Sequence, residues 1–344
     1  MTRDQFKRPL RDLRISVTDR CNFRCGYCMP GDRTYRFLPR AELLTFEEIA
    51  RLTRIFVHHG VRKLRLTGGE PLLRRDLHEL VAQLAAIDGV EDLALTTNGS
   101  HLARRARALK EAGLHRVTVS LDSLQTDRFQ KLVGKTADPG SVVAAIDAAL
   151  AVGLKVKVNT VVQKGVNDDE LVDLAGFFRE RGLEIRFIEF MDVGTLNGWK
   201  LDRVTTAEEI RDRIHQVFPN DPVPPRVAGE TARRYRYRDG SGSFGVIASV
   251  TQPFCGGCNR ARLSARGSLF TCLFATRGID FRDMLRSGAS DDELCERLDA
   301  IWRGRDDRYS ELRAAGGPVP DRGSQAPSDD DAASDKVEMY YIGG

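Results

Sequence analysis

Short runs of apolar residues, many of them β-branched, alternate with amphipathic helical stretches over the first two thirds of the chain. The apolar runs predict strands at 13–18, 63–67, 93–97, 117–122, 156–162 and 185–190. The amphipathic stretches predict helices at 45–59, 76–87, 102–112, 140–152 and 168–181. This alternation is typical of βαβ units and a parallel sheet. About six repeats favour a partial (β/α)6 barrel over a complete eight-stranded one.

Within each predicted strand, apolar and polar residues alternate. Ile15 and Val17, for example, alternate with Arg14 and Ser16. Parallel strands buried on both faces are usually apolar throughout, so one face of these strands meets a polar environment. The apolar phase must face the helices, which predicts an inner cavity lined by polar and cationic residues and suited to an anionic ligand. The alternative is a sheet with one face open to solvent.

The pattern changes beyond about residue 200. A proline-rich stretch at 219–225 ends the alternation, and 235–250 predicts a hairpin around Asp239-Gly240. A capping box at 290–293 opens a helix that runs to 302. We therefore expect a partial barrel over 1–200 and an α+β extension over 201–302. A flexible acidic linker over 303–336 and a short tail over 337–344 would follow them.

Composition and charge exclude several classes of protein. The 344 residues are 41% hydrophobic and 30% charged, which is typical of a globular protein. No apolar run is long enough to span a membrane, and the N-terminal residues lack the apolar centre of a signal peptide, so we expect a cytoplasmic protein. A net charge of +4 does not support a nucleic-acid-coating role.

Six of the seven cysteines form two tight triads. Cys21, Cys25 and Cys28 have Cys-x3-Cys-x2-Cys spacing and follow the first predicted strand, where barrels place their chemistry. Three thiolates on one loop can bind three irons of a 4Fe–4S cluster and leave the fourth iron open. A zinc site needs a fourth ligand, and no histidine follows before His58.

The second triad is Cys255, Cys258 and Cys272. Cys295 is the remaining cysteine and would have to complete a zinc site here. It lies in an apolar helical pattern, where a buried structural thiol is the usual explanation. We therefore favour a second 4Fe–4S cluster with an open iron, and keep the zinc site as the alternative.

The first triad, read as Cys-x3-Cys-x-aromatic-Cys, resembles the signature of radical S-adenosylmethionine (SAM) enzymes. That resemblance implies that SAM binds the open iron and that its cleavage produces a 5′-deoxyadenosyl radical. The positions that match the SAM contacts of that family are Tyr27, Gly69 in Thr67-Gly68-Gly69-Glu70-Pro71, Ser120 and Met191.

Motifs along nearly the whole chain are similar to the GTP 3′,8-cyclase family, which catalyses the first step of molybdenum cofactor biosynthesis. They are RPLRDLRISVTDRCNFRCGYCMP, RLTGGEPLLRRDL, TTNG, VSLDSL, RFIEFM, CGGCNRARL and the terminal YIGG. The resemblance implies removal of the 3′ hydrogen of GTP, bond formation between C3′ and C8, and guanine binding at the second cluster. Positions that match GTP contacts are Arg14, Arg65, Thr96, Lys157, Arg260 and Arg262.

The resemblance also implies a role for the chain end. In this family the terminal diglycine, here Gly343-Gly344, reaches into the active site, and Arg14, Arg260 and Arg262 support the chemistry. Expected partners are a flavodoxin- or ferredoxin-type reductant, the downstream cyclic pyranopterin monophosphate synthase and a second copy in a homodimer. Two alternatives stay open: a radical SAM enzyme acting on a peptide or tetrapyrrole, and a zinc-containing nucleic-acid-binding protein.

Overall fold

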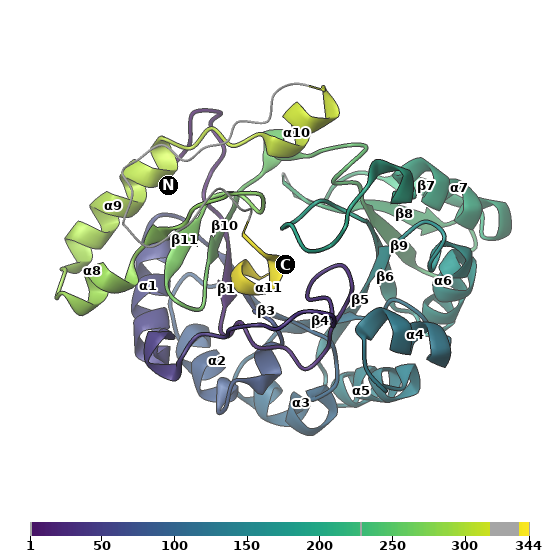
Figure 1. Cartoon of the computed structure of the whole chain (residues 1–344), viewed down its shortest axis with the longest axis horizontal. Helices are drawn as coiled ribbons and strands as arrows, with labels where there is room; N and C mark the ends of the chain where they lie inside the picture. The colour runs from purple at the N-terminus through teal and green to yellow at the C-terminus, as the bar shows by residue number, and fades with distance from the viewer. Residues whose placement is uncertain (1, 228, 317–336, 344) are drawn as a thin grey trace.

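The computed structural model describes residues 2–227, 229–316 and 337–343 (Figure 1). Most of the expected acidic linker and Gly344, the last residue of the expected tail, lie outside these residues. Six parallel strands follow one another in chain order across the sheet, each hydrogen-bonded to the next. They are β1 (Asp12–Ser16), β2 (Lys63–Thr67), β3 (Asp92–Thr97), β4 (Arg116–Ser120), β5 (Lys155–Val162) and β6 (Glu184–Glu189). The predicted partial (β/α)6 barrel is confirmed.

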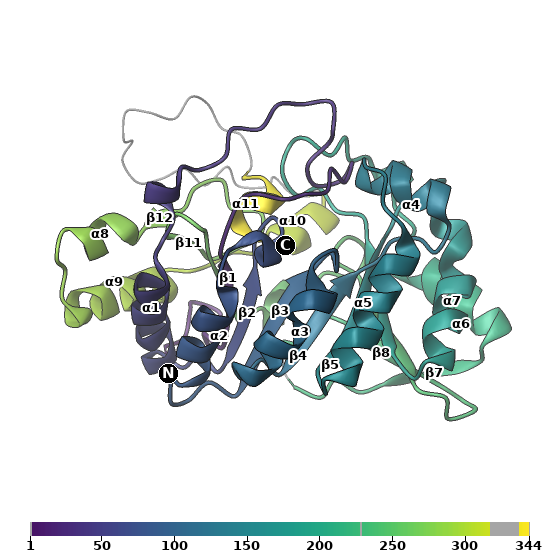
Figure 2. The same ribbon diagram turned by 90° about the horizontal axis from the view of Figure 1, so that it is seen from below.

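Helices cover the outside of this curved sheet (Figures 1 and 2). They are α1 (Phe46–His58), α2 (Leu77–Ala85), α3 (Leu102–Glu111), α4 (Thr126–Val133), α5 (Pro139–Ala151), α6 (Leu171–Glu180) and α7 (Ala207–Val217). Short 3-10 turns lie at Arg40–Glu42, Pro71–Leu73, Asp168–Glu170, Leu201–Arg203 and Cys255–Gly257. The sequence pattern did not anticipate α4, which lies between β4 and α5 and contacts the first cysteine loop, as described below.

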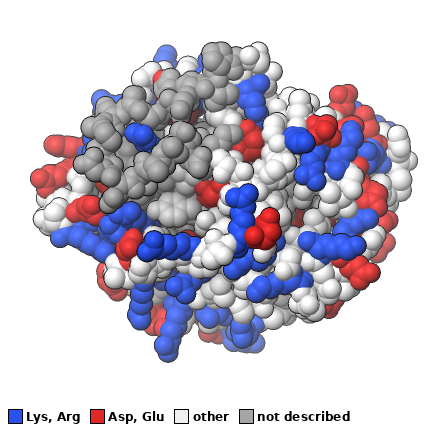
Figure 3. Space-filling model, viewed as in Figure 1, with Lys and Arg blue, Asp and Glu red and all other residues white. Residues whose placement is uncertain are grey.

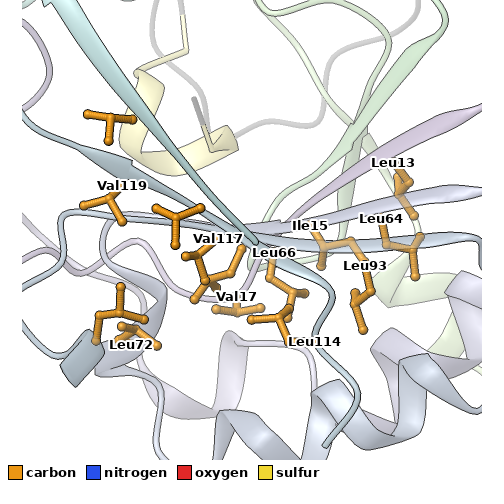
Figure 4. Close-up of a cluster of buried hydrophobic side chains, with 14 of the residues drawn as sticks. Leu13, Ile15, Val17, Leu64, Leu66, Leu72, Leu93, Leu114, Val117 and Val119 are labelled. Atoms are coloured by element: carbon orange, nitrogen blue, oxygen red, sulfur yellow. The ribbon is translucent and has the colours of Figure 1, made fainter. Parts of the chain in front are cut away.

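In the parallel strands, the apolar residues face the helices and the polar residues face the interior of the barrel, as predicted. Ile15, Leu66 and Val117 are fully buried and belong to the main hydrophobic core between sheet and helices. Figure 4 shows labelled core side chains of β1, β2, β3 and β4, with helices on one side of the strands and α11 on the other. The polar phase, which includes Arg14 and Arg65, therefore lines the inner face of the barrel.

The C-terminal part adds strands to both edges of the same sheet. Its elements are β7 (Asn220–Val223), β8 (Arg233–Tyr237), β9 (Ser243–Ile247), β10 (Arg260–Leu263), β11 (Ser268–Phe270), β12 (Ile279–Asp280), α8 (Arg282–Arg286), α9 (Asp291–Arg303), α10 (Tyr309–Ala314) and α11 (Met339–Ile342). Strand β9 pairs in parallel with β6, and β10 pairs in parallel with β1. The C-terminal extension therefore continues the barrel sheet, which has 12 strands in the described part of the chain.

Local signals in the C-terminal part were predicted correctly. The β8–β9 hairpin turns through Gly240, whose φ of 80° suits glycine. Ser290 and Glu293 form the capping box of α9. Cys295 is only partly buried, and it packs against the hydrophobic core from this helix.

Candidate active site

The first cysteine triad lies on the loop that follows β1, at the C-terminal edge of the parallel strands. The end of α4 anchors this loop, because the carbonyl of Val133 accepts a hydrogen bond from Arg24 N (2.7 Å). The carbonyl of Leu132 accepts a second one from Gly26 N (3.3 Å). Helix α4 therefore positions the three thiols.

The glycine segment after β2 packs directly against the same loop. A Cβ on Gly68 would lie 2.4 Å from the Thr18 carbonyl oxygen, and one on Gly69 would lie 2.3 Å from that of Arg20. Gly69 N also donates to Thr18 O at 2.8 Å. These two glycines therefore allow the backbone after β2 to pack closely against the backbone of the first cysteine loop.

Glu70 connects this segment to the end of β3. Its buried carboxylate accepts hydrogen bonds from Leu72 N (3.0 Å), Thr97 Oγ1 (2.7 Å) and Asn98 N (2.7 Å). Burial raises the pKa of Glu70 to about 7. Asn98 Nδ2 in turn lies 3.9 Å from Cys21 Sγ. The TTNG motif and the glycine segment thus support the cysteine loop as one unit.

The three thiols of this loop fit a cluster of metal ions. Burial raises the pKa of Cys21 to about 11 and that of Cys28 to about 12, and the sulfurs of the triad act on one another electrostatically. Thiolates that are buried close together need compensating positive charge, and the irons of a cluster would supply it. Among the described residues, no group of three or more His, Cys, Asp or Glu has the geometry for one metal ion. In a 4Fe–4S cluster each thiolate binds a different iron.

The expected SAM-contacting residues lie around the same edge of the sheet. Tyr27 donates a hydrogen bond from its hydroxyl to Asp122 Oδ2 (2.7 Å), and burial raises the pKa of Asp122 to about 6. Ser120 is the last residue of β4. Met191 follows β6, and its sulfur accepts a hydrogen bond from Ser249 Oγ (3.6 Å).

A row of arginines crosses the inner face. Arg262 on β10, Arg14 on β1 and Arg65 on β2 are direct neighbours in register. Burial and the neighbouring guanidiniums lower the pKa of Arg14 and of Arg65 to about 9, and that of Arg262 to about 10. The Nε atoms of Arg14 and Arg65 are buried without a hydrogen-bond partner among the described residues. The Asp12 carboxylate offsets this lowering only in part, and the remaining positive charge matches an anionic ligand.

Thr96 and Lys157 continue this polar lining. Thr96 Oγ1 accepts a hydrogen bond from Arg65 Nη1 at 3.1 Å. Lys157 Nζ forms an ion pair with Glu184 at 2.6 Å, and Arg186 Nε contacts the same carboxylate at 2.7 Å. Sequence reasoning did not single out Glu184 and Arg186, although their alternation with Ile185 and Phe187 on β6 carries the same signal.

The second triad lies where β10 begins. Arg260 and Arg262 are both on this extended strand and share a face, as their spacing predicts. Arg260 Nη2 donates to Cys258 Sγ at 3.2 Å. Burial opposes ionisation of Cys258, but Arg260 and Arg305 outweigh it and lower its pKa to about 7. Burial raises the pKa of Cys272 to about 12.

The chain end returns to the inner face of the barrel, where α11 lies against β1 (Figure 1). Arg262 Nη1 donates a hydrogen bond to the carbonyl oxygen of Gly343. Gly343 has a φ of 73°, and a Cβ there would lie 2.2 Å from Thr67 Cγ2, so both conformation and space require glycine. Tyr340 N–H interacts with the thiol of Cys28. The described tail thus touches residues near both triads.

The fold and the thiol loop define a radical SAM enzyme, and residues 15–178 match the model of the Radical SAM superfamily. Residues 183–311 match the model described as Molybdenum Cofactor Synthesis C. The chain belongs to the GTP 3′,8-cyclase family. It is 55% identical to the GTP 3′,8-cyclase of Acidothermus cellulolyticus, with 99% of each chain covered. It is 48% identical to that of Staphylococcus aureus strain MRSA252, covering 99% of this chain and 98% of the relative.

Among solved structures, Streptococcus suis SuiB bound to S-adenosylmethionine has the same fold. The TM-score is 0.59 at 16% identity, covering 90% of this chain and 68% of SuiB. None of the helices described for the present chain is long and apolar enough to cross a membrane. Basic and acidic side chains are interspersed on the face seen in Figure 3, in keeping with the net charge of +4.

Proposed function

We propose that this chain is a GTP 3′,8-cyclase. It converts GTP to (8S)-3′,8-cyclo-7,8-dihydroguanosine 5′-triphosphate, by removal of the 3′ hydrogen and formation of the C3′–C8 bond, as the first step of molybdenum cofactor biosynthesis. The observation that carries the proposal is the buried row Arg262, Arg14 and Arg65, whose pKa values are lowered by burial and by neighbouring guanidiniums, an effect that Asp12 offsets only in part. A triphosphate supplies the missing negative charge.

The cofactors of the reaction are two 4Fe–4S clusters and SAM. In the proposal, Cys21, Cys25 and Cys28 hold one cluster, and Cys255, Cys258 and Cys272 hold the other. The first cluster and SAM together supply the one-electron chemistry that removes the hydrogen. The residues proposed to hold SAM at that cluster are Tyr27, Gly69, Ser120 and Met191.

The chain's own residues bind and orient the nucleotide. Arg14, Arg65, Thr96 and Lys157 are proposed to hold the triphosphate and ribose on the inner face, and Arg186 joins them because it shares the carboxylate of Glu184 with Lys157. Arg260 and Arg262 lie beside the second triad and are proposed to act on the guanine end. Because the described tail already contacts Arg262, Gly343 and Gly344 are proposed to complete the site.

Other parts of the proposal concern the cell. The chain would work in the cytoplasm, receive electrons from a flavodoxin- or ferredoxin-type protein, and pass its product to cyclic pyranopterin monophosphate synthase. A homodimer is the proposed assembly. No nucleic acid or membrane is needed as a partner.

The decisive experiment is anaerobic incubation of the reconstituted protein with SAM, dithionite and GTP, followed by mass spectrometry. We expect roughly eight irons per chain, formation of 5′-deoxyadenosine, and a product that is derived from GTP and has the same mass as GTP. SAM cleavage without loss of GTP would exclude the cyclase and favour a peptide substrate. Stoichiometric zinc in a colourless protein would exclude every radical SAM reaction.

The role of the tail has its own test. Deletion of Gly343 and Gly344 should abolish cyclisation while iron content and GTP-independent SAM cleavage stay at the wild-type level, since both triads are intact. Normal GTP turnover by the truncated chain would contradict the tail's role without affecting the cyclase assignment.

A further inference from the structure

A buried network of charges lies behind the second triad, away from the arginine row. Asp4 pairs with Arg8 (2.5 Å) and with Arg305 (3.2 Å), and the side chains of all three are at most 2% exposed. Arg305 also pairs with Asp307 at 3.1 Å. The network therefore joins the N-terminal residues to the segment after α9, which sequence analysis assigned to the linker.

Both arginines of this network extend to the cysteine loop. Arg8 Nη1 donates to the carbonyl oxygen of Cys255 at 2.8 Å. Arg305 Nη1 donates to the carbonyl oxygen of Cys258 at 2.8 Å, and Arg305 Nη2 lies 3.3 Å from Cys258 Sγ. The guanidinium of Arg305 thus binds one cysteine at both its backbone and its sulfur.

Packing leaves Arg305 little freedom to move. Its guanidinium lies 4.5 Å from the ring centroid of Trp302, which is fully buried and donates from Nε1 to the Arg8 carbonyl oxygen at 3.1 Å. A guanidinium held in this way presents its donors in a fixed geometry. Cys258 Sγ consequently accepts hydrogen bonds from two guanidiniums, that of Arg260 on β10 (3.2 Å) and that of Arg305 in the network (3.3 Å).

We propose that Arg305 is a positioning residue for the second cluster. The hydrogen bond from Arg305 to Cys258 Sγ raises the reduction potential of this cluster, and Asp4, which pairs with Arg305, reduces that effect. Positive charge and hydrogen bonds at a ligating sulfur stabilise the reduced, more negative cluster. A carboxylate paired with Arg305 acts in the opposite direction. This inference rests on the proposed function only in that Cys255, Cys258 and Cys272 bind a cluster.

The test measures the second cluster by itself. In the full-length chain carrying Cys21→Ser, Cys25→Ser and Cys28→Ser, the remaining iron signal comes from the second triad. Its midpoint potential is followed by electron paramagnetic resonance during a redox titration. The variants in this background are Arg305→Gln, Arg305→Lys and Asp4→Asn. Arg303→Gln is the matched control, because Arg303 is 70% exposed and pairs only with Asp299 among the described residues.

The signs of the expected shifts differ between the variants. Arg305→Gln should move the midpoint to a more negative potential, Arg305→Lys by less, and Arg303→Gln should leave it unchanged. Asp4→Asn should move it to a less negative potential. Loss of the second-triad iron in Arg305→Gln with retention in Arg305→Lys would also support the proposal, since the charge then holds the thiolate loop.

Other results would overturn the inference. Full iron content with an unchanged potential in Arg305→Gln, or shifts of the same sign in Arg305→Gln and Asp4→Asn, would leave Arg305 with a structural role only. Absence of iron from the parent chain would refute the second cluster itself. Shifts as expected in this background, together with no cyclisation of GTP by the wild-type chain, would refute the proposed function and leave the role of Arg305 standing.

Discussion

Replacing Arg14 by methionine should stabilise the chain in the absence of nucleotide and remove its response to GTP. Arg14 lies between Arg262 and Arg65 in register. Its Nε has no partner among the described residues, so methionine loses no hydrogen bond there while retaining most of the side-chain volume. Burial, followed by the charge of Arg262, holds the pKa of Arg14 at about 9 instead of 12.5.

The magnitude follows from this pKa. A difference between 12.5 and about 9 corresponds to about 5 kcal/mol. Relaxation and water penetration reduce the effective cost of a buried charge, and we take about 2 kcal/mol. A lowered pKa disfavours the charged form, so the cost is complete below pH 9 and disappears only as the pH rises towards 12.5. At pH 7 the Arg14→Met variant should therefore melt about 3 °C above the wild type.

Thermal unfolding of the anaerobically reconstituted protein, with and without GTP, measures both effects. Wild-type protein should gain about 3 kcal/mol at a GTP concentration near 100 times its Kd, and the variant should gain little. Arg75→Met is the matched control, because the Arg75 side chain is 93% exposed and should change neither quantity. A melting temperature of Arg14→Met below that of the wild type, or an undiminished shift by GTP, would refute the reasoning.

Three further predictions follow from the site. Gly69→Ala should lose about half of the bound iron, since its Cβ would lie 2.3 Å from a backbone oxygen of the first cysteine loop. Gly26→Ala, on the same loop but with no atom within 4 Å of its Cβ, should keep all the iron. Cys295→Ser should leave the iron content unchanged, whereas Cys272→Ser should lose the second cluster. Loss of iron from the Cys295→Ser variant would mean that Cys295 is a fourth protein ligand at the second triad. Burial, followed by Arg186, lowers the pKa of Lys157 to about 8, so the KM for GTP should rise above pH 8 as this cation is lost, and Lys157→Arg should abolish that rise.

Local patterns in the sequence determined the frame of the molecule. The strict alternation in strands such as β2, with Leu64 and Leu66 buried and Lys63 and Arg65 inward, depends only on the period of an extended chain and on which phase is apolar. The same is true of the capping box at Ser290 and of the thiol spacing, because each is read within a few consecutive residues. These features gave the partial barrel, the polar lumen and the two candidate cluster loops.

Contacts between residues distant in sequence were decided only by the tertiary structure. No local pattern reveals that β9 and β10 extend the two edges of the barrel sheet, since strand pairing depends on register across long separations. The same holds for Gly69 packing on the first cysteine loop and for Arg305, which composition placed in a linker. The sequence by itself thus identified the chemical groups. The three-dimensional packing determined which charges remain without a partner, and that residual charge is the physical basis for proposing an anionic substrate.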